Sequence, residues 1–548
     1  MRVRSWTSDV ETPVSLFARL SANESHAFLL DSNEGDSRLA RFSFIGIRPS
    51  RIFEVKNGKA RLITTSSGNE QYFNCDDPFA WLAAQQKLTD AEIAARQALL
   101  AQSMPLPWEG TLPFTGGWVG ITGFGATQYT DAIAPKPCDP LQVPDLIYGE
   151  YHEVLIVDHR LRRTFWLCDL PDAEADTRWR DLMAALAQPA QLPVLALDAF
   201  AEKTSDADWI FNRVEASMDK AAFCEAVEQT RQWITEGQVF QLVLAQRYSL
   251  RLSDADSTEN NQKTLAQRYS LRLSDADNAG AECELKTSPA HQPSQAEITL
   301  LDAQALQTYR VLQAISPTPY GYWLKFNHYH YIGASPETFV SCQQQQVKLR
   351  ALAGTRYRGK TQADDARLAY ELCANVKELA EHRMLVDLDR NDLGRCCKPG
   401  SIQVGQIAAL TRYTHVMHLT TDISGELADD KTPLDLFSAC LPRGTVSGAP
   451  KIRAMQLINQ LEPECRGFYS GVVGYFGADG NMDGAIAIRS VLLQPGWAHV
   501  HAGAGIVFDS IAEQEYLETR NKAKSTLAAV QIAMALAESP ENLAMQPA

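Results

Sequence analysis

The spacing of hydrophobic and polar residues predicts a dense mixture of short strands and helices in the first 205 residues. Short apolar segments predict strands at HAFLLDS, RFSFIGI and RIFEV, and an Ala-, Gln- and Leu-rich stretch predicts a helix from about 78 to 104. The segment at 149–170 alternates as a hairpin does. A helix pattern follows 171, and QPAQLPVLALDAF is then typical of a linker.

The pattern changes from about residue 207, where longer helices are predicted. An amphipathic segment at 219–237 ends at a glycine, and 238–252 then predicts a buried strand. One long helix is predicted within 364–395 and a terminal helix at 510–537, after HVHAGAGIVFDS, which predicts a strand and a glycine-rich turn. Because strands and helices alternate irregularly, the pattern favours an α+β fold over a regular βαβ series.

The sequence LAQRYSLRLSDAD occurs twice without a change, at 244–256 and 265–277. The first copy follows VFQLV, which can continue a buried strand, whereas the second follows the polar segment NNQKT. We therefore predict that the first copy lies in the core. Residues from about 254 to 298 are predicted to be a solvated insertion that contains a tandem duplication.

Composition excludes some classes of function and indicates the cellular compartment. The net charge of −15 argues against non-specific binding to nucleic acid, which needs a positive surface. The 11 cysteines form no CxxC pair, which favours reduced thiols over a disulfide framework or a zinc ribbon. The chain shows no apolar export signal and no stretch of about 18 apolar residues, so we expect a cytoplasmic protein.

Two pairs of glutamates are candidate metal ligands. Glu378 and Glu381 are three residues apart, as are Glu515 and Glu518, so each pair shares one face of its predicted helix. Taken alone, each pair is more typical of a solvated helix face. The glycine-containing segments AGAGIV and RGTVSGAPKIRAM precede helices and indicate loops whose backbone N–H groups could bind an anion. Carboxylates beside an oxygen-rich substrate suit Mg²⁺.

Other catalytic signals are weaker. His418 lies in an apolar stretch, where a packed core histidine is more typical than a general base. The chain contains no GxSxG or HExxH motif and no set of kinase motifs, so hydrolase, zincin and kinase functions lack support.

The second half of the chain resembles the chorismate-utilising enzyme family over about 210–535, the insertion excepted. The motifs that carry the resemblance are ALAGTRYRG (351–359), KELAEHRMLVDLDRNDLGR (377–395), YTHVMH (413–418), RGTVSGAPKIRAM (443–455), GAIAIRS (484–490), AGAGIV (502–507) and EQEYLETRNKA (513–523). In the first half, FLLDS, RFSFIGIRP and PFTGGWVG resemble the anthranilate synthase component I branch of that family.

The resemblance implies a fold and a division of the chain. The fold is the chorismate-binding one, an α+β arrangement in which two large antiparallel β-sheets pack as a sandwich with helices outside. Residues 1–205 would form an N-terminal region that carries a regulatory site and intertwines with the core. Residues 206–535 would form the catalytic domain, with the insertion at about 254–298.

The resemblance also implies a magnesium site. Glu381 and Glu518 would bind Mg²⁺, with Glu378 and Glu515 in direct or water-mediated contact. The ion would neutralise and orient the ring carboxylate of chorismate. Lys522 would lie near the same carboxylate.

The remaining site residues follow from the same resemblance. Glu337 would protonate the departing C4 hydroxyl, and His418 could assist the elimination of pyruvate. Tyr469 and Arg489 would bind the enolpyruvyl carboxylate. Thr445, Gly503 and Gly505 would line the site.

Two positions bear on the product. Relatives that add water carry a lysine at the position of Gln241, and aminodeoxychorismate synthase component I carries one at the position of Ala353. Neither residue here can do that work, so we expect anthranilate, the product of the first committed step of tryptophan biosynthesis. The alternatives are an aminodeoxychorismate or aminodeoxyisochorismate synthase component, or a catalytically silent regulatory subunit.

The resemblance suggests a partner subunit and an inhibitor. The chain has no GxCxG nucleophile elbow, so we expect a separate glutamine amidotransferase subunit to supply ammonia. A tryptophan site that causes feedback inhibition is expected where Ser32, Pro319 and Tyr320 match the family, joined by Val473 and Tyr475. Asp31, Ser316 and Gly321 depart from the family pattern at that site.

Overall fold

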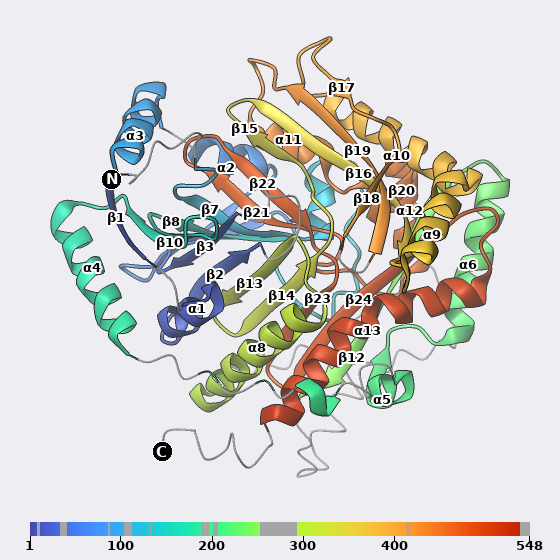
Figure 1. Cartoon of the computed structure of the whole chain (residues 1–548), viewed down its shortest axis with the longest axis horizontal. Helices are drawn as coiled ribbons and strands as arrows, with labels where there is room; N and C mark the ends of the chain where they lie inside the picture. The colour runs from blue at the N-terminus through green and yellow to red at the C-terminus, as the bar shows by residue number, and fades with distance from the viewer. Residues whose placement is uncertain are drawn as a thin grey trace.

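The computed structural model describes residues 1–7, 11–32, 41–85, 88–103, 112–131, 133–188, 192, 195, 197–200, 206–252, 293–413 and 416–537. These residues form two large antiparallel sheets that face each other, with helices on the outside (Figure 1). The α+β sandwich expected from the sequence is therefore confirmed.

The first sheet contains β12, the strand that carries Gln241. In spatial order its strands are β1 (Arg2–Thr7), β10 (Arg163–Cys168), β9 (Glu153–Asp158), β3 (Phe42–Ile47), β2 (His26–Asp31), β13 (Tyr320–Phe326), β14 (Tyr329–Ser335), β23 (Ser490–Gln494), β24 (Trp497–Ile506), β12 (Gln241–Arg251) and β11 (Val214–Ala216), and β20 (Gly448–Ala449) also pairs with β12.

The second sheet contains the strand with His418. Its order is β17 (Gln403–Val404), β19 (Val416–Glu426), β16 (Gln346–Tyr357), β15 (Ser341–Gln343), β22 (Met482–Ile486), β21 (Val472–Gly477), β7 (Gly117–Thr122), β8 (Leu146–Tyr151), β4 (Arg51–Lys56), β5 (Lys59–Thr64) and β6 (Asn69–Asn74), and β18 (Ala409–Arg412) also pairs with β19.

Both sheets mix strands from the two halves of the sequence. In the first sheet β2 pairs with β13, and in the second β7 pairs with β21. Figure 1 shows the consequence, because blue strands of the N-terminal region lie within the same layers as yellow and orange strands. A boundary near residue 205 thus divides the chain but does not divide either sheet.

Aromatic side chains fill the space between the sheets. Phe44 of β3 packs edge-on against Phe114, at 5.8 Å between ring centroids, and Phe114 lies 4.6 Å from Tyr475 of β21. All three rings are buried. Such rings bury a large apolar area and fix the spacing of two facing sheets.

Helices cover the outer faces. Those on the first sheet include α1 (Pro13–Ser21), α4 (Asp172–Ala187), α8 (Gln295–Ile315) and α13 (Ala512–Ala537), and α8 and α13 lie side by side (Figure 1). Those on the second include α2 (Pro78–Gln85), α10 (Val376–Gly394) and α11 (Pro433–Cys440). The other helices are α3 (Asp90–Ser103), α5 (Ala207–Phe211), α6 (Lys220–Thr235), α9 (Gln362–Ala374) and α12 (Lys451–Leu461), with 3₁₀ turns η1 (Phe124–Tyr129), η2 (Leu197–Phe200) and η3 (Gly444–Val446).

The long helix predicted within 364–395 is α10, which follows α9 and is capped by Asn375. The helical stretch predicted from about 78 to 104 consists of α2 and α3. One element prediction was wrong in part. The residues AGAGI belong to β24, so the predicted glycine-rich turn before α13 is strand up to Ile506. That strand pairs with β12 along its length, so its backbone takes part in the sheet and does not form a loop.

The structure describes the first copy of the duplicated sequence. Leu244–Arg251 lies in β12 with its apolar side chains buried, which confirms the core position predicted for this copy. The second copy lies outside the described residues. Near the end of the predicted insertion, α8 begins at Gln295, with a capping box between Ser294 and Glu297.

Candidate active site

The glutamates of α10 lie at its first turns, against β12. The side chain of Asn375 caps the helix by accepting a hydrogen bond from the Glu378 N–H, at 3.1 Å. Glu381 accepts a hydrogen bond from the Gln241 amide, at 3.0 Å. Burial raises the pKa of Glu381, and the nearby charges of Glu378 and Glu518 raise it further. Glu518 belongs to α13, so the carboxylates of α10 and α13 lie close enough to influence each other's ionisation.

The glutamates of α13 complete this acidic group. Glu518 forms an ion pair with Lys522 at 2.6 Å, and the Lys522 ammonium also donates to the Gly503 carbonyl at 2.9 Å. Burial raises the pKa of Glu515, and the charge of Glu518 acts in the same direction. Lys522 thus lies between the acidic group and the strand that carries the glycines.

These carboxylates fit a cation that takes few ligands from the protein. Among the residues that the structure describes, no three His, Cys, Asp or Glu side chains gather closely enough to enclose a metal ion. A closed cage is therefore not formed. Carboxylates that repel one another across two helices suit Mg²⁺, which keeps several waters and binds through one or two carboxylates plus the substrate.

Two glycines of β24 allow the site to close around its polar groups. A Cβ atom on Gly503 would lie 2.9 Å from the Tyr469 hydroxyl, and one on Gly505 would lie 2.8 Å from the Gln241 amide nitrogen. Any side chain at either position would displace Tyr469 or Gln241, which are candidate substrate-binding residues. The Tyr469 ring is further held by stacking on His501, with 5.5 Å between centroids and 13° between planes.

Arg489 stands in an unusual backbone conformation between β22 and β23. Its φ is 54°, in the left-handed region that a non-glycine residue seldom adopts. Its guanidinium donates to the Lys522 carbonyl at 2.6 Å, and burial lowers its pKa. The strained backbone and this hydrogen bond fix a half-buried cation beside α13, where an anionic ligand would neutralise it.

Glu337 and Thr445 leave buried oxygens unused. Neither the Glu337 Oε1 nor the Thr445 Oγ1 has a hydrogen-bond partner within the described part of the chain. Burial raises the pKa of Glu337, against the opposing charge of Arg443. The structure therefore supplies the burial that favours the protonated form of this carboxyl, as an acid catalyst needs.

His418 lies on β19, opposite the bulge of β16 that includes Ala353. Its Nδ1 is 3.1 Å from the Gly354 carbonyl, which can only accept, so a neutral ring carries its proton on Nδ1. Thr355 Oγ1 is 3.0 Å from the same nitrogen. Burial lowers the pKa of His418, which favours the neutral ring and leaves Nε2 as an acceptor.

The expected tryptophan residues lie elsewhere, between the two sheets. Ser32 directly follows β2, and Pro319 and Tyr320 stand at the start of its partner β13. Val473 and Tyr475 are on β21 of the facing sheet. The side chain of Asp31 is bound by the hydroxyls of Ser43, at 2.5 Å, and Tyr309, at 2.9 Å.

The sequence did not point to two groups of charged residues that lie beside these sites. Asp483 is paired with Tyr475 across β21 and β22, and burial raises its pKa to about 7. Arg466 is fully enclosed near Tyr469 and forms an ion pair with Glu462. Their only signal is that they lie within or beside glycine-containing motifs, which does not reveal a buried charge.

Comparison with known proteins places this geometry in a family. The family model for chorismate binding enzymes matches residues 25–270 and 292–528. Anthranilate synthase component 1 of Thermus thermophilus is 35% identical over 97% of this chain and 98% of that relative. The same component of Bacillus caldotenax is 34% identical over 96% and 93%.

Solved structures agree with these relatives. Anthranilate synthase component I from Streptococcus pneumoniae covers 89% of this chain and is covered over 92% of its own length, with a TM-score of 0.68 and 31% identity. The menaquinone-specific isochorismate synthase of Escherichia coli shares the fold, with a TM-score of 0.60 at 17% identity.

Proposed function

Because the chain belongs to the family of chorismate binding enzymes, we propose that it converts chorismate and ammonia into anthranilate and pyruvate, as component 1 of an anthranilate synthase. The relatives that match nearly the whole chain carry that name. The observation that carries the choice of product is the state of Gln241, whose amide donates to Glu381. An amide nitrogen has no basic lone pair, so it cannot activate water for the isochorismate reaction.

Ala353 favours the same product. It is a buried residue of β16 beside the bulge that faces His418, and it offers no nucleophile. An attack on the ring by an enzyme amine, as expected of an aminodeoxychorismate synthase, therefore has no donor there. Ammonia from outside the chain remains as the nitrogen source.

The residues at the site divide the reaction between them. Arg489 and Tyr469 bind the enolpyruvyl carboxylate, and Lys522 balances the charge of the ring carboxylate. Glu337, kept protonated by burial, gives its proton to the departing C4 hydroxyl. His418 presents its free Nε2 and accepts the proton whose loss accompanies pyruvate elimination.

Magnesium is the metal that the acidic group fits. Glu381 and Glu518 would hold it, with Glu378 and Glu515 in support, and when bound it neutralises and orients the ring carboxylate of chorismate. Burial is the main cause of the raised pKa values of Glu381 and Glu515, and neighbouring carboxylates add to it. The positive charge of the ion would favour the ionised form of both groups.

A partner subunit and an inhibitor complete the proposal. A separate glutamine amidotransferase subunit would supply ammonia, as the name component 1 of the relatives suggests a second component. Tryptophan would bind between the sheets, its ring against Tyr320 and Tyr475 and its ammonium near Asp483. Among the described residues no cation pairs with the Asp483 carboxylate, so the ammonium of an amino-acid ligand would match it.

The compartment is proposed as the cytoplasm. None of the described helices has the length and apolar character needed to cross a membrane. The ten cysteines that the structure describes are free thiols. Free thiols are the usual state in a reducing compartment.

Product identification tests the function and its alternatives together. The purified chain is incubated with chorismate, Mg²⁺ and ammonium, and the products are separated and weighed by mass spectrometry. We expect anthranilate and pyruvate, inhibition by added tryptophan, and little turnover when glutamine replaces ammonium. Accumulation of aminodeoxyisochorismate, aminodeoxychorismate or isochorismate would assign a different member of the family, and no product would indicate a silent subunit.

A further inference from the structure

One edge of β12 has a gap in its strand pairing. Along its other edge β12 is paired with β24 from Leu242 to Arg251. On the edge in question β20 pairs only with Gln241 and Leu242, and β11 pairs only from Tyr248 onwards. The backbone groups between these two short strands need other partners, because buried N–H and C=O groups are costly when left unpaired.

The buried ion pair of Glu462 and Arg466 fills this gap. Glu462 accepts a hydrogen bond from the Ala245 N–H at 2.9 Å, and Arg466 donates to the Val243 carbonyl at 2.8 Å. The two side chains are bound to each other through both carboxylate oxygens, at 2.5 and 2.8 Å. The pair therefore takes the place of a strand beside the residues that follow Gln241.

The same guanidinium holds two other parts of the candidate site. It donates to the Val446 carbonyl in η3, at 2.8 Å, and η3 carries Thr445. It also lies 5.7 Å from the centre of the Tyr469 ring, and the Tyr469 N–H donates to the Arg466 carbonyl at 3.2 Å. One buried side chain thus connects β12, η3 and Tyr469.

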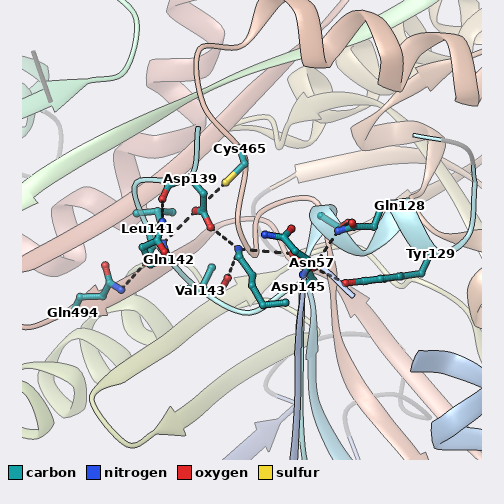
Figure 2. A network of polar contacts seen from close by, with 12 residues as sticks. Asn57, Gln128, Tyr129, Asp139, Leu141, Gln142, Val143, Asp145, Cys465 and Gln494 are labelled. Atoms are coloured by element: carbon teal, nitrogen blue, oxygen red, sulfur yellow. Dashed lines mark hydrogen bonds and ion pairs between the residues drawn. The ribbon is translucent and has the colours of Figure 1, made fainter. Parts of the chain in front are cut away.

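The segment that carries Arg466 is anchored again from the opposite side. The Cys465 thiol donates to Asp139 at 3.0 Å, and Asp139 belongs to a polar network that reaches Asp145 and Tyr129 (Figure 2). Glu464 accepts two hydrogen bonds from Arg247 of β12. With its neighbours fixed on both sides, Arg466 has little freedom to move with the ligand.

We propose that Arg466, through its pair with Glu462, is a positioning residue that sets the distance between Gln241, Thr445 and Tyr469 in the chorismate site. The proposal rests on the proposed function and adds a residue that does not itself contact substrate. Lysine would keep the charge but could not bind Glu462, Val243 and Val446 at once, because only the guanidinium offers five donors in a planar fork.

The substitution Arg466→Lys tests the proposal, with Arg41→Lys as a matched control. Arg41 makes a comparable two-point contact with the fully buried Asp158, at 3.1 and 2.8 Å, at the far end of the same sheet. We expect Arg466→Lys to raise the KM for chorismate at least tenfold while the KM for ammonium stays within twofold. Arg41→Lys should change neither constant.

A second variant covers the case in which Arg466→Lys does not fold. The double substitution Glu462→Gln and Arg466→Met removes the pair without leaving a buried charge, which proteins often tolerate. It should fold and show the same selective rise in the KM for chorismate. An unchanged KM in either folded variant, or equal changes for chorismate, ammonium and the Arg41 control, would overturn the proposal. Absence of anthranilate formation by the unmodified chain would instead refute the proposed function.

Discussion

At the scale of single residues, the site depends on groups whose charge is decided by burial. Glu337 is the clearest example, because its side chain is buried beside Arg443 and one oxygen has no partner among the residues described. The resemblance to the family pointed to Glu337, but the sequence could not show that its carboxyl would be desolvated. The same holds for Arg466, whose guanidinium is buried against β12, a strand far away in the chain.

The raised pKa of Glu337 predicts the pH dependence of activity. The protonated acid is the active form, so turnover should fall as the pH rises through a value above that of an ordinary glutamate. Glu337→Gln should lower kcat by about a hundredfold or more, in the range of general acid catalysis, and remove that decline. The measurement is kcat against pH, and an unaltered decline in the variant would contradict the role.

The same pKa shift predicts an effect on stability. Since the folded chain holds the Glu337 proton more tightly than the unfolded chain, its stability falls as the pH rises above the ordinary glutamate pKa. Glu337→Gln lacks this cost. The melting temperature of the variant should therefore gain on that of the unmodified chain as the pH rises above about 4, where an ordinary glutamate begins to ionise.

At the scale of elements, the hydrophobic pattern predicted most strands and helices but not their ends. The long pattern at 364–395 is two helices, because α9 ends at Asn375 and the side chain of that residue accepts a hydrogen bond from the Glu378 N–H of α10. Likewise AGAGI was read as a turn, because glycine favours turns, whereas its glycines serve close contacts within β24. Local propensity cannot show such contacts, since their partners come from distant segments.

The cap of α10 links an element to the proposed metal site. Asn375→Ala should lower the free energy of unfolding by about 1 kcal/mol and weaken Mg²⁺ binding, because Glu378 and Glu381 lie in the first turns of that helix. Thr432→Ala is the matched control, since Thr432 caps α11 in the same way. Both variants should lose similar stability in denaturant titrations, and only the first should need more Mg²⁺ for half-maximal activity.

At the scale of the whole molecule, the two sheets are assembled from strands of both halves. The N-terminal and C-terminal regions share one inner layer of aromatic rings, and the expected tryptophan residues belong to both. The candidate active site and the residues expected to bind tryptophan are therefore parts of one folded unit. Sequence alone indicated the sandwich through family resemblance, but strand order is a long-range property that hydrophobic spacing does not contain.

The duplicated sequence offers a comparison within the same molecule. Leu244 is fully buried in β12, and Leu265 is the equivalent residue of the second copy. Leu244→Asp should prevent stable folding, because a charge would enter the core, whereas Leu265→Asp should leave the melting temperature unchanged. If both variants are equally destabilised, the second copy contributes to the core and the prediction of a solvated insertion is wrong.

The most direct test of the central claim is the rate of anthranilate formation, followed by fluorescence, as Mg²⁺ is added to the metal-free chain with chorismate and ammonium. The rate should rise from near zero to saturation for the unmodified chain. It should stay near zero for Glu518→Gln. Glu513→Gln should behave as the unmodified chain, since Glu513 is exposed on the same helix and pairs with Lys220. Full activity without Mg²⁺, or in Glu518→Gln, would contradict the account.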